Sequence, residues 1–351
     1  MNAKLKIGIV GVGGIANGVH IPGLLKTGEA EIYAICDIDT NRLNEVGEKL
    51  GVPESRRFED YNALINCGVD AVEICTPNYL HSKIACAAVR AGKPINVEKP
   101  LDVNVLATQE LENELKQHPV PNMMCFSYRF KPAVRYAKKI LEDKLLGDII
   151  NVKVEYLKSS AFWEGRRLDW RFVKEYAGTG VLGDLGVHLI DMATFLVGDI
   201  TEVIGRTATV VKERKRLDSE ELAPVETDDT CSFLAHFECG ATADFFITRC
   251  AYGNANTIKY DIYGTKGVLQ FNLNEPNKLM VCIGKVDCES DGLHEITVPG
   301  KYALEQEQNF VNLLRGRETP YHPDITEGIK CQKILDAIYE SEQEKRWITL
   351  K

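Results

Sequence analysis

The chain has 351 residues, with 42 lysines and arginines against 51 aspartates and glutamates, which gives a formal net charge of −9. Apolar residues make up 44% and charged residues 26%, a globular composition that excludes collagen-like, disordered and disulfide-scaffold classes. The acidic balance argues against a nucleic-acid-binding protein, and the lack of any run of about 18 apolar residues argues against a membrane span. The length suggests two domains, each large enough to bury a core.

Eleven cysteines are an odd count, and no C-x-x-C pair occurs among them. Several lie inside apolar strand-like runs, where cysteine behaves as a small buried hydrophobe. In an oxidising compartment such thiols would risk scrambled disulfides, so we expect a reducing cytoplasm. Residues 4–12 briefly look like a short signal peptide, but four glycines between positions 8 and 14 argue against export.

Strand and helix patterns alternate over the first 126 residues. Apolar runs predict strands over residues 4–10, 31–36, 70–75, 94–97 and 123–126. Helical patterns lie between them, over residues 16–25, 41–50, 79–91 and 102–117. Asp102 is expected to cap the last helix. Such alternation indicates a doubly wound parallel sheet covered on both faces, which we assign to a first domain over residues 1–126.

From residue 127 onward, the pattern changes to an alternation of period two. Half-buried strands are predicted over residues 150–156, 231–237, 241–247, 258–263 and 267–271. Helices are predicted over residues 179–196, 305–314 and 325–341. The charged segment 212–227 is expected to be an exposed loop. We therefore expect an α+β domain over residues 127–351, with an open, mostly antiparallel sheet that has one covered face.

Residues 11–16, Gly-Val-Gly-Gly-Ile-Ala, fit the G-x-G-x-x-A pattern of dinucleotide-binding sites, after a strand and before a helix. Gly11 permits the tight turn, Gly13 lets the backbone approach a pyrophosphate, and Ala16 allows close packing of the helix on the strand. The diphosphate would lie at the helix N-terminus. The alternative is a tight turn that binds nothing.

Asp37 ends the second predicted strand, 21 positions after Ala16. A carboxylate there accepts hydrogen bonds from the adenosine ribose hydroxyls and repels a 2′-phosphate. Ile38 follows, with no arginine beside Asp37 to receive that phosphate. The sequence therefore favours NAD over NADP.

Two clusters follow predicted strands and so would lie at the ligand-binding edge of a doubly wound sheet. The first is Thr76-Pro77-Asn78 with His81, which fits a plain turn capped by Asn78 equally well. The second is Glu98-Lys99-Pro100. Burial would lower the pKa of Lys99 and suit it to polarise or deprotonate a hydroxyl. The alternative is a surface lysine paired with Glu98.

A third cluster lies on the predicted helix over residues 179–196. Asp184, His188 and Asp191 have the spacing i, i+4 and i+7, which places them on one helix face. Three interpretations stay open: an acid–base pair in which His188 titrates near neutral pH, a metal site, which lacks a second histidine or a cysteine at ligand spacing, and a polar stripe at a domain interface.

Taken together, these motifs resemble the Gfo/Idh/MocA family, the relatives of glucose–fructose oxidoreductase and inositol 2-dehydrogenase. The resemblance covers nearly the whole chain and includes Tyr128-Arg129-Phe130 and the hairpin around residues 263–267. It implies an N-terminal Rossmann domain and a C-terminal domain that binds substrate and whose sheet often forms the oligomer interface. It also implies catalytic roles for Lys99, Asp184 and His188, no metal, and a cis peptide bond between Lys99 and Pro100.

The resemblance further implies a set of cofactor contacts. We expect NAD to be bound by Gly11, Gly13, Gly14, Ile15, Asp37, Thr76, Asn78, His81, Glu98 and Lys99.

The segment over residues 162–171 is rich in tryptophan and arginine, whose aromatic faces and planar donors suit sugar rings, although Trp170 could simply pack in the core. With the stretch 249–256, it looks most like relatives that act on inositols, anhydrosugars or glucosides. We expect substrate contacts from Arg129, Trp163, Trp170, Arg171, Asp184 and His188.

The expected activity is hydride transfer between NAD and a secondary ring hydroxyl of a sugar, glycoside or inositol, with C3 of a glucoside or an inositol carbon favoured. His188 would take the hydroxyl proton, Lys99 would donate a hydrogen bond to the same oxygen, and Asp184 would tune both. The rivals are a protein that senses NAD without chemistry and an NADP-linked reductase of a non-sugar carbonyl. A homo-oligomer formed through the C-terminal sheet is expected.

Overall fold

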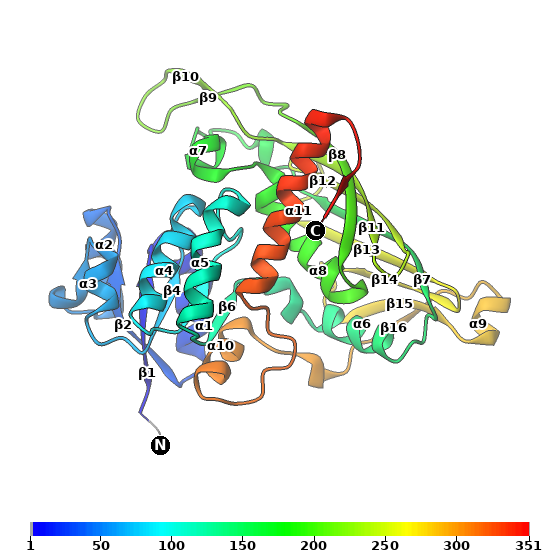
Figure 1. Ribbon diagram of the computed structural model, residues 1–351, viewed down its shortest axis with the longest axis horizontal. Coiled ribbons are helices and arrows are strands. Elements are labelled where there is room, and N and C mark those ends of the chain that lie inside the picture. Colours follow the sequence, from blue (N-terminus) through cyan, green and yellow to red (C-terminus); the bar gives the residue numbers. More distant parts are fainter. Residues whose placement is uncertain (1–2, 351) are drawn as a thin grey trace. The chain divides into compact units, whose positions relative to one another are not determined.

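The computed structural model describes residues 3–350, which divide into two compact units (Figure 1). Of the described residues, unit 1 comprises 3–126 and 304–329, and unit 2 comprises 127–303 and 330–350. The sequence pattern places residues 304–329 in the second domain, whereas in the structure α10 (Gln306–Leu314) packs on α1 (Ile21–Lys26) of unit 1. Such a long-range pairing leaves no periodic signal in the sequence.

Unit 1 contains a six-stranded parallel sheet of order β3-β2-β1-β4-β5-β6. This is the doubly wound strand order of Rossmann folds, so the predicted parallel sheet is confirmed. The strands are β1 (Leu5–Val10), β2 (Ala30–Cys36), β3 (Arg57–Phe58), β4 (Ala71–Ile74), β5 (Ile95–Val97) and β6 (Asn122–Met124).

Helices cover this sheet, and all four predicted ones are present. They are η1 (Ala16–His20) continued by α1, α2 (Thr40–Leu50), η3 (Asn78–Leu80) continued by α4 (His81–Arg90), and α5 (Val105–Gln117). The prediction that Asp102 caps α5 is wrong. The cap is Asn104, which accepts a hydrogen bond from the Ala107 N–H at 3.1 Å. The Asp102 carboxylate instead accepts from the N–H groups of Ser82 and Val103.

Unit 2 contains a nine-stranded sheet of order β16-β15-β14-β13-β7-β12-β11-β8-β17. Within residues 3–350, the only parallel pair in this sheet is β7 with β12, so the mostly antiparallel sheet is confirmed. Its strands are β7 (Ile149–Leu157), β8 (Ile200–Ala208), β11 (Thr230–Phe237), β12 (Thr242–Thr248), β13 (Thr257–Gly264), β14 (Gly267–Asn272), β15 (Lys278–Ile283), β16 (His294–Thr297) and β17 (Ile348–Thr349).

The segment 212–227 is not the plain exposed loop that its charge suggests. It forms a hairpin of β9 (Glu213–Lys215) and β10 (Leu222–Pro224). Arg214 of this hairpin is buried, and its Nη2 donates to the Ala161 carbonyl at 2.7 Å. The hairpin is therefore tied to the segment that carries the predicted sugar-binding residues.

Helices pack on one face of the unit 2 sheet. They include α6 (Pro132–Glu142), α8 (Val187–Val197) and part of α11 (Ile325–Glu344). The Tyr260 hydroxyl on β13 donates to the Leu189 carbonyl of α8 at 2.5 Å. The helical stretch Lys174–Val197 is long and apolar enough to cross a membrane, but 78% of its most apolar window is buried. Burial to this extent is typical of a core helix.

Candidate active site

The glycine-rich loop after β1 leaves room for a ligand. Gly11 has φ +88°, and a Cβ added there would lie 2.7 Å from the Cys75 carbonyl oxygen, so only glycine fits. A Cβ added at Gly13 or Gly14 would meet nothing within 4 Å, whereas Ala16 is fully buried. The loop therefore has the open surface that the close approach of a pyrophosphate requires.

Asp37 is connected directly to this loop. One oxygen of its buried carboxylate, Oδ2, accepts from the Val12 N–H at 3.0 Å, and Oδ1 accepts from the Asp39 N–H at 2.9 Å. The expectation that no arginine lies beside Asp37 is wrong. The Arg42 Nη1 lies 3.4 Å from Asp37 Oδ2, and its Nη2 pairs with Asp39 at 3.0 Å. Two carboxylates thus offset the charge of this arginine.

The segment after β4 contains the predicted Thr76, Asn78 and His81. The Thr76 Oγ1 is buried and has no hydrogen-bond partner within residues 3–350, and Asn78 is buried at the start of η3. Both ring nitrogens of His81 face main-chain carbonyls, of Pro100 at 2.7 Å and Thr76 at 2.8 Å. His81 therefore acts on the cofactor edge by holding the backbone rather than by presenting a ring nitrogen to a ligand.

Glu98, Lys99 and Pro100 follow β5 at its carboxyl end. Glu98 is buried, and its Oε2 accepts from the Lys99 N–H at 3.0 Å. Its other oxygen, Oε1, accepts from the His20 Nε2 at 2.9 Å. The Lys99–Pro100 peptide bond is cis, as the family resemblance implies.

In unit 2, the helical stretch over 182–197 begins with a π-helical segment, η7 (Leu182–Gly186), which contains Asp184. The Asp228 carboxylate accepts from the N–H groups of Gly180 at 2.6 Å and Leu182 at 2.9 Å, and the Tyr339 hydroxyl also donates to it. A Cβ at Gly180 would lie 1.9 Å from the Asp228 carbonyl oxygen. This close contact fixes where the stretch begins.

Asp191 and Arg129 form a buried ion pair within unit 2. The Arg129 Nη2 lies 2.6 Å from Asp191 Oδ1, and its Nε donates to the same carboxylate at 2.9 Å. Both side chains are at most 5% exposed. The ion pair gives both Arg129 and Asp191 a structural role in unit 2, and the substrate contact expected of Arg129 stays a prediction.

His188 is buried beside a chain of hydroxyl and amide groups. Its ring lies edge-to-face on Tyr128, with the centroids 4.7 Å apart. The hydroxyls of Tyr128 and Tyr156 lie 2.9 Å apart, and the Asn256 Oδ1 accepts from Tyr156 at 2.9 Å. Burial, together with Tyr128 and the charge of Asp184, raises the pKa of Tyr156 far above its usual value, so this hydroxyl stays protonated.

The hydrogen-bonded groups beside His188 could be predicted only in part from the sequence. Tyr128 and Asn256 lie in segments that the family resemblance singles out, but Tyr156 looks like one more inward residue of an alternating strand. What makes Tyr156 different is its position opposite Ile258 on β13, close to the turn that carries Asn256.

The predicted sugar-binding segment presents exposed aromatic rings. Phe162 stacks on Tyr252 with the centroids 4.9 Å apart, and Trp163 is 56% exposed. The Arg171 guanidinium lies 4.4 Å from the centroid of the half-buried Trp170 ring. Rings of this kind, with an apolar face and polar neighbours, suit a ligand of mixed polarity such as a sugar.

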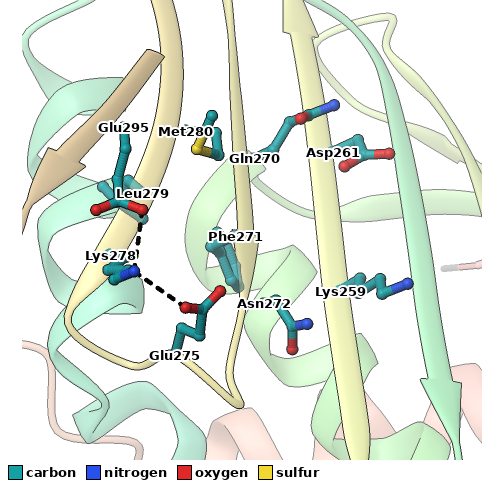
Figure 2. Close-up of a pocket in the computed structure, with 10 residues that line it drawn as sticks. All are labelled: Lys259, Asp261, Gln270, Phe271, Asn272, Glu275, Lys278, Leu279, Met280 and Glu295. Carbon is teal, nitrogen blue, oxygen red and sulfur yellow. Dashed lines mark ion pairs between the residues drawn. The ribbon is translucent and has the colours of Figure 1, made fainter. Parts of the chain in front are cut away.

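A pocket in unit 2 lies elsewhere (Figure 2). Its lining includes Lys259 and Asp261, which alternate on β13 with the inward Tyr260 that contacts α8. The pocket is therefore on the face of the sheet opposite the helix that carries His188. Lys278 pairs there with Glu275 and Glu295, at 3.1 Å each (Figure 2).

Comparison with known proteins agrees with this arrangement. Residues 5–126 match an oxidoreductase family with an NAD-binding Rossmann fold, and residues 134–270 match the Gfo/Idh/MocA C-terminal domain. Levoglucosan dehydrogenase of Pseudarthrobacter phenanthrenivorans is 30% identical over 343 residues, with 87% of each chain covered. Myo-inositol 2-dehydrogenase of Thermotoga maritima is 28% identical, covering 75% of this chain and 74% of its own.

A solved structure has the same fold over its whole length. Levoglucosan dehydrogenase in complex with NADH and L-sorbose superposes with a TM-score of 0.91 at 27% identity, and both chains are fully covered. The open glycine loop and the Asp37 carboxylate fit the NAD that such relatives bind. The chain belongs to the Gfo/Idh/MocA family and is an NAD-binding oxidoreductase.

Proposed function

We propose that this enzyme oxidises a secondary ring hydroxyl of a neutral sugar, glycoside or inositol, with NAD as the electron acceptor and with C3 of a glucoside or an inositol carbon as the favoured position. The observation that carries the proposal is the buried His188, held against Tyr128 beside a network of hydroxyl and amide groups in unit 2. The named relatives are dehydrogenases of levoglucosan and myo-inositol, which are both polyhydroxylated rings.

Each catalytic residue has one task. His188 accepts the proton of the reacting hydroxyl, and the edge-to-face contact with Tyr128 fixes the orientation of its ring. Lys99 donates a hydrogen bond to the same oxygen and offsets its developing negative charge. Asp184 lies close enough to influence the pKa of both Tyr156 and Arg166, so its charge tunes this polar cluster. NAD, when bound, supplies the hydride acceptor.

Cofactor contacts are proposed for the open loop residues Gly11, Gly13, Gly14 and Ile15, for Asp37, and for the segments that carry Thr76, Asn78, Glu98 and Lys99. Substrate contacts are proposed for Trp163, Trp170, Arg171, Asp184 and His188.

The test is turnover with NAD on levoglucosan, methyl glucosides, inositols and glucose 6-phosphate, in wild type and in Lys99→Ala and His188→Ala. We expect turnover on at least one neutral ring and a loss of about 10²–10⁴-fold in each variant, with the NAD dissociation constant unchanged. NAD binding without turnover on any compound would support the sensing alternative. A loss below tenfold in both variants would contradict the catalytic assignment.

We also propose a homo-oligomer formed through the open face of the unit 2 sheet. Phe246 and Leu234 are about half exposed on that face, among charges of both signs such as Lys153 and Asp244, which suits contact with a second copy. Phe246→Glu is expected to lower the mass measured by sedimentation equilibrium. An unchanged mass, or a monomeric wild type, would contradict the interface.

A cytoplasmic location is proposed because none of the eleven cysteines forms a disulfide. Cys282 and Cys288 are unbonded even though their sulfurs lie 3.7 Å apart. Thiol titration of protein purified anaerobically from its native host should find all eleven thiols reduced. A disulfide in that material would contradict a reducing compartment.

A further inference from the structure

We propose that two buried histidines, His20 and His81, are positioning residues that hold segment 98–100 on both sides of Lys99. The inference rests on the proposed catalytic role of Lys99. It concerns unit 1 alone, where both rings and the whole segment lie.

His20 holds the segment on its N-terminal side. The ring is fully buried at the end of η1, and its Nε2 donates to Glu98 Oε1 at 2.9 Å. The second oxygen of the same carboxylate accepts from the Lys99 N–H at 3.0 Å. One carboxylate thus connects the imidazole to the backbone of the lysine.

The other side of the His20 ring is anchored in the core. The Nδ1 lies 3.0 Å from Glu73 Oε1 on β4 and 3.4 Å from Glu307 Oε1 on α10. A carboxylate oxygen accepts but does not donate, so a ring between carboxylates on both sides is best satisfied as an imidazolium. A Cβ at position 23 on α1 would lie 2.7 Å from the Glu307 carboxyl carbon, so the glycine there leaves room for the Glu307 side chain.

The surroundings support this charge state. Burial opposes a charged ring, but the charge of Glu73 and the hydrogen bond to Glu307 hold the pKa of His20 well above its usual value. Burial also raises the pKa of Glu73. The imidazolium of His20 therefore supplies a positive charge that faces the carboxyl groups of Glu73, Glu98 and Glu307.

His81 holds the segment on its C-terminal side. The ring is 1% exposed at the start of α4, with Nδ1 2.7 Å from the Pro100 carbonyl and Nε2 2.8 Å from the Thr76 carbonyl. Carbonyl oxygens only accept, so both contacts are hydrogen bonds only when both nitrogens carry a proton.

Together the two rings connect the lysine segment to β4, to the turn after it and to α10. The segment is thereby held before any substrate arrives, and this matters because a displacement of about 1 Å at a reacting group can reduce the rate about 10²-fold. Neither histidine is asked to touch the substrate.

A metal ion is the rival explanation for the His20 cluster. Among residues 3–350, His20, Glu73 and Cys125 form the one set of three such donors that lies close enough to share a metal, within 4.8 Å of one another. However, the Asn96 amide already donates to Glu73 Oε1 at 2.8 Å, and the Cys125 thiol lies 3.4 Å from Asn96 Oδ1. Hydrogen bonds within the protein therefore account for the cluster.

The experiment compares His20→Gln and His81→Gln with His118→Gln, a matched control at an exposed histidine at the end of α5, where the ring lies 4.0 Å from Glu114. We expect each histidine variant to lower kcat about 10²-fold while the NAD dissociation constant changes less than threefold. We also expect faster hydrogen–deuterium exchange in peptides covering residues 95–103. The control should change neither quantity. Glu98→Gln, which breaks the link without removing a ring, should reproduce the His20 result.

The outcomes separate this inference from the proposed function. If Lys99→Ala abolishes turnover but His20→Gln and His81→Gln do not slow it, or if His118→Gln slows it equally, the positioning role is wrong. If Lys99→Ala has no effect, the catalytic assignment is wrong, while the exchange measurement still tests the contacts.

A loss of kcat in the double variant Lys99→Ala/His20→Gln that is no larger than in Lys99→Ala alone would support the inference that His20 acts through the lysine. Stoichiometric metal in the purified enzyme, with activity lost on chelation, would overturn the inference.

Discussion

The residues assigned to NAD and those assigned to the sugar are held in different ways. In unit 1, Asp37 and Glu98 are buried, and each carboxylate oxygen has a partner within the protein. In unit 2, the Phe162, Trp163 and Tyr252 rings are 37–74% exposed. A cofactor shared by many enzymes suits a prebuilt site, whereas substrate choice is set by surfaces that can change without loss of the fold.

The two units also share a device. Each carries a π-helical segment at the start of its predicted functional helix, η1 in unit 1 and η7 in unit 2. Such segments are rare and occur often at functional sites. His20 closes the first and Asp184 lies within the second, so both segments position a residue on which the proposed mechanism depends.

The largest effect is expected from a substitution in the glycine-rich loop of unit 1, which forms part of the proposed NAD site. Gly11→Ala places a Cβ 2.7 Å from the Cys75 carbonyl oxygen at a positive φ. It should weaken NAD binding more than 100-fold by calorimetry and lower the free energy of unfolding by about 1–3 kcal/mol. Gly18→Ala is the control, because Gly18 lies in η1 with open space around its Cβ position. Equal effects of the two substitutions would contradict a special demand at Gly11.

The next effect is expected at η7. Asp228→Ala leaves the N–H groups of Gly180 and Leu182 without their acceptor, which should cost about 1–3 kcal/mol in urea unfolding. Since η7 carries Asp184, kcat should fall as well. Asp218→Ala, at an exposed residue in the turn between β9 and β10, should change neither value. An Asp228 variant with wild-type kcat would show that the start of η7 does not control the chemistry.

A substitution at Asp37 tests whether the proposed cofactor site of unit 1 selects NAD over NADP. Asp37→Ser removes the carboxylate that repels a 2′-phosphate and leaves Arg42 paired with Asp39, 3.0 Å away. The ratio of kcat/KM for NADP to that for NAD should rise at least about tenfold. Adding Arg42→Ala should reverse that rise. If the ratio stays unchanged in Asp37→Ser, the carboxylate does not determine the preference.

The pH dependence of stability should come from unit 1. The folded-state pKa is raised for both Glu73, from 4.5, and His20, from 6.5. A raised pKa stabilises the protonated folded state, so this contribution is complete below the unfolded-state pKa and is lost as pH rises through the folded-state value. The melting temperature should therefore fall as pH rises above 6.5. His20→Gln should flatten that fall, and an unchanged slope would contradict the shift assigned to His20.

The sequence predicted those elements whose burial is periodic. The unit 1 strands other than β3 are apolar runs between polar turns, so they could be found, whereas β3 has two residues and no pattern. β8 was missed because its burial does not alternate regularly. Arg42 was missed because the turn into α2 at Asp39 brings its side chain back to Asp37, five positions earlier in the chain.

The His20 cluster could not be predicted for a related reason. His20, Glu73 and Glu307 are far apart in the chain, and each stands in a segment that otherwise reads as ordinary helix or strand. Only the packing of α1, β4 and α10 brings them together. In contrast, Gly11, Asp37 and His188 could be predicted as site residues because each belongs to a local motif whose spacing carries the signal.

The smallest effect is expected among the exposed aromatic residues of unit 2 that we assign to the sugar. Trp163→Ala removes a ring that is 56% exposed, so the free energy of unfolding should change by less than about 0.5 kcal/mol. If the ring stacks on the sugar, KM for the substrate should rise several-fold while kcat and the NAD dissociation constant stay constant, because binding is lost equally from ground and transition states. Leu217→Ala, a 67% exposed residue outside the proposed site, is the control for loss of surface area. A fall in kcat with constant KM would mean that Trp163 acts on the reacting geometry, and the division between a fixed cofactor side and an adaptable substrate side would then have to be redrawn.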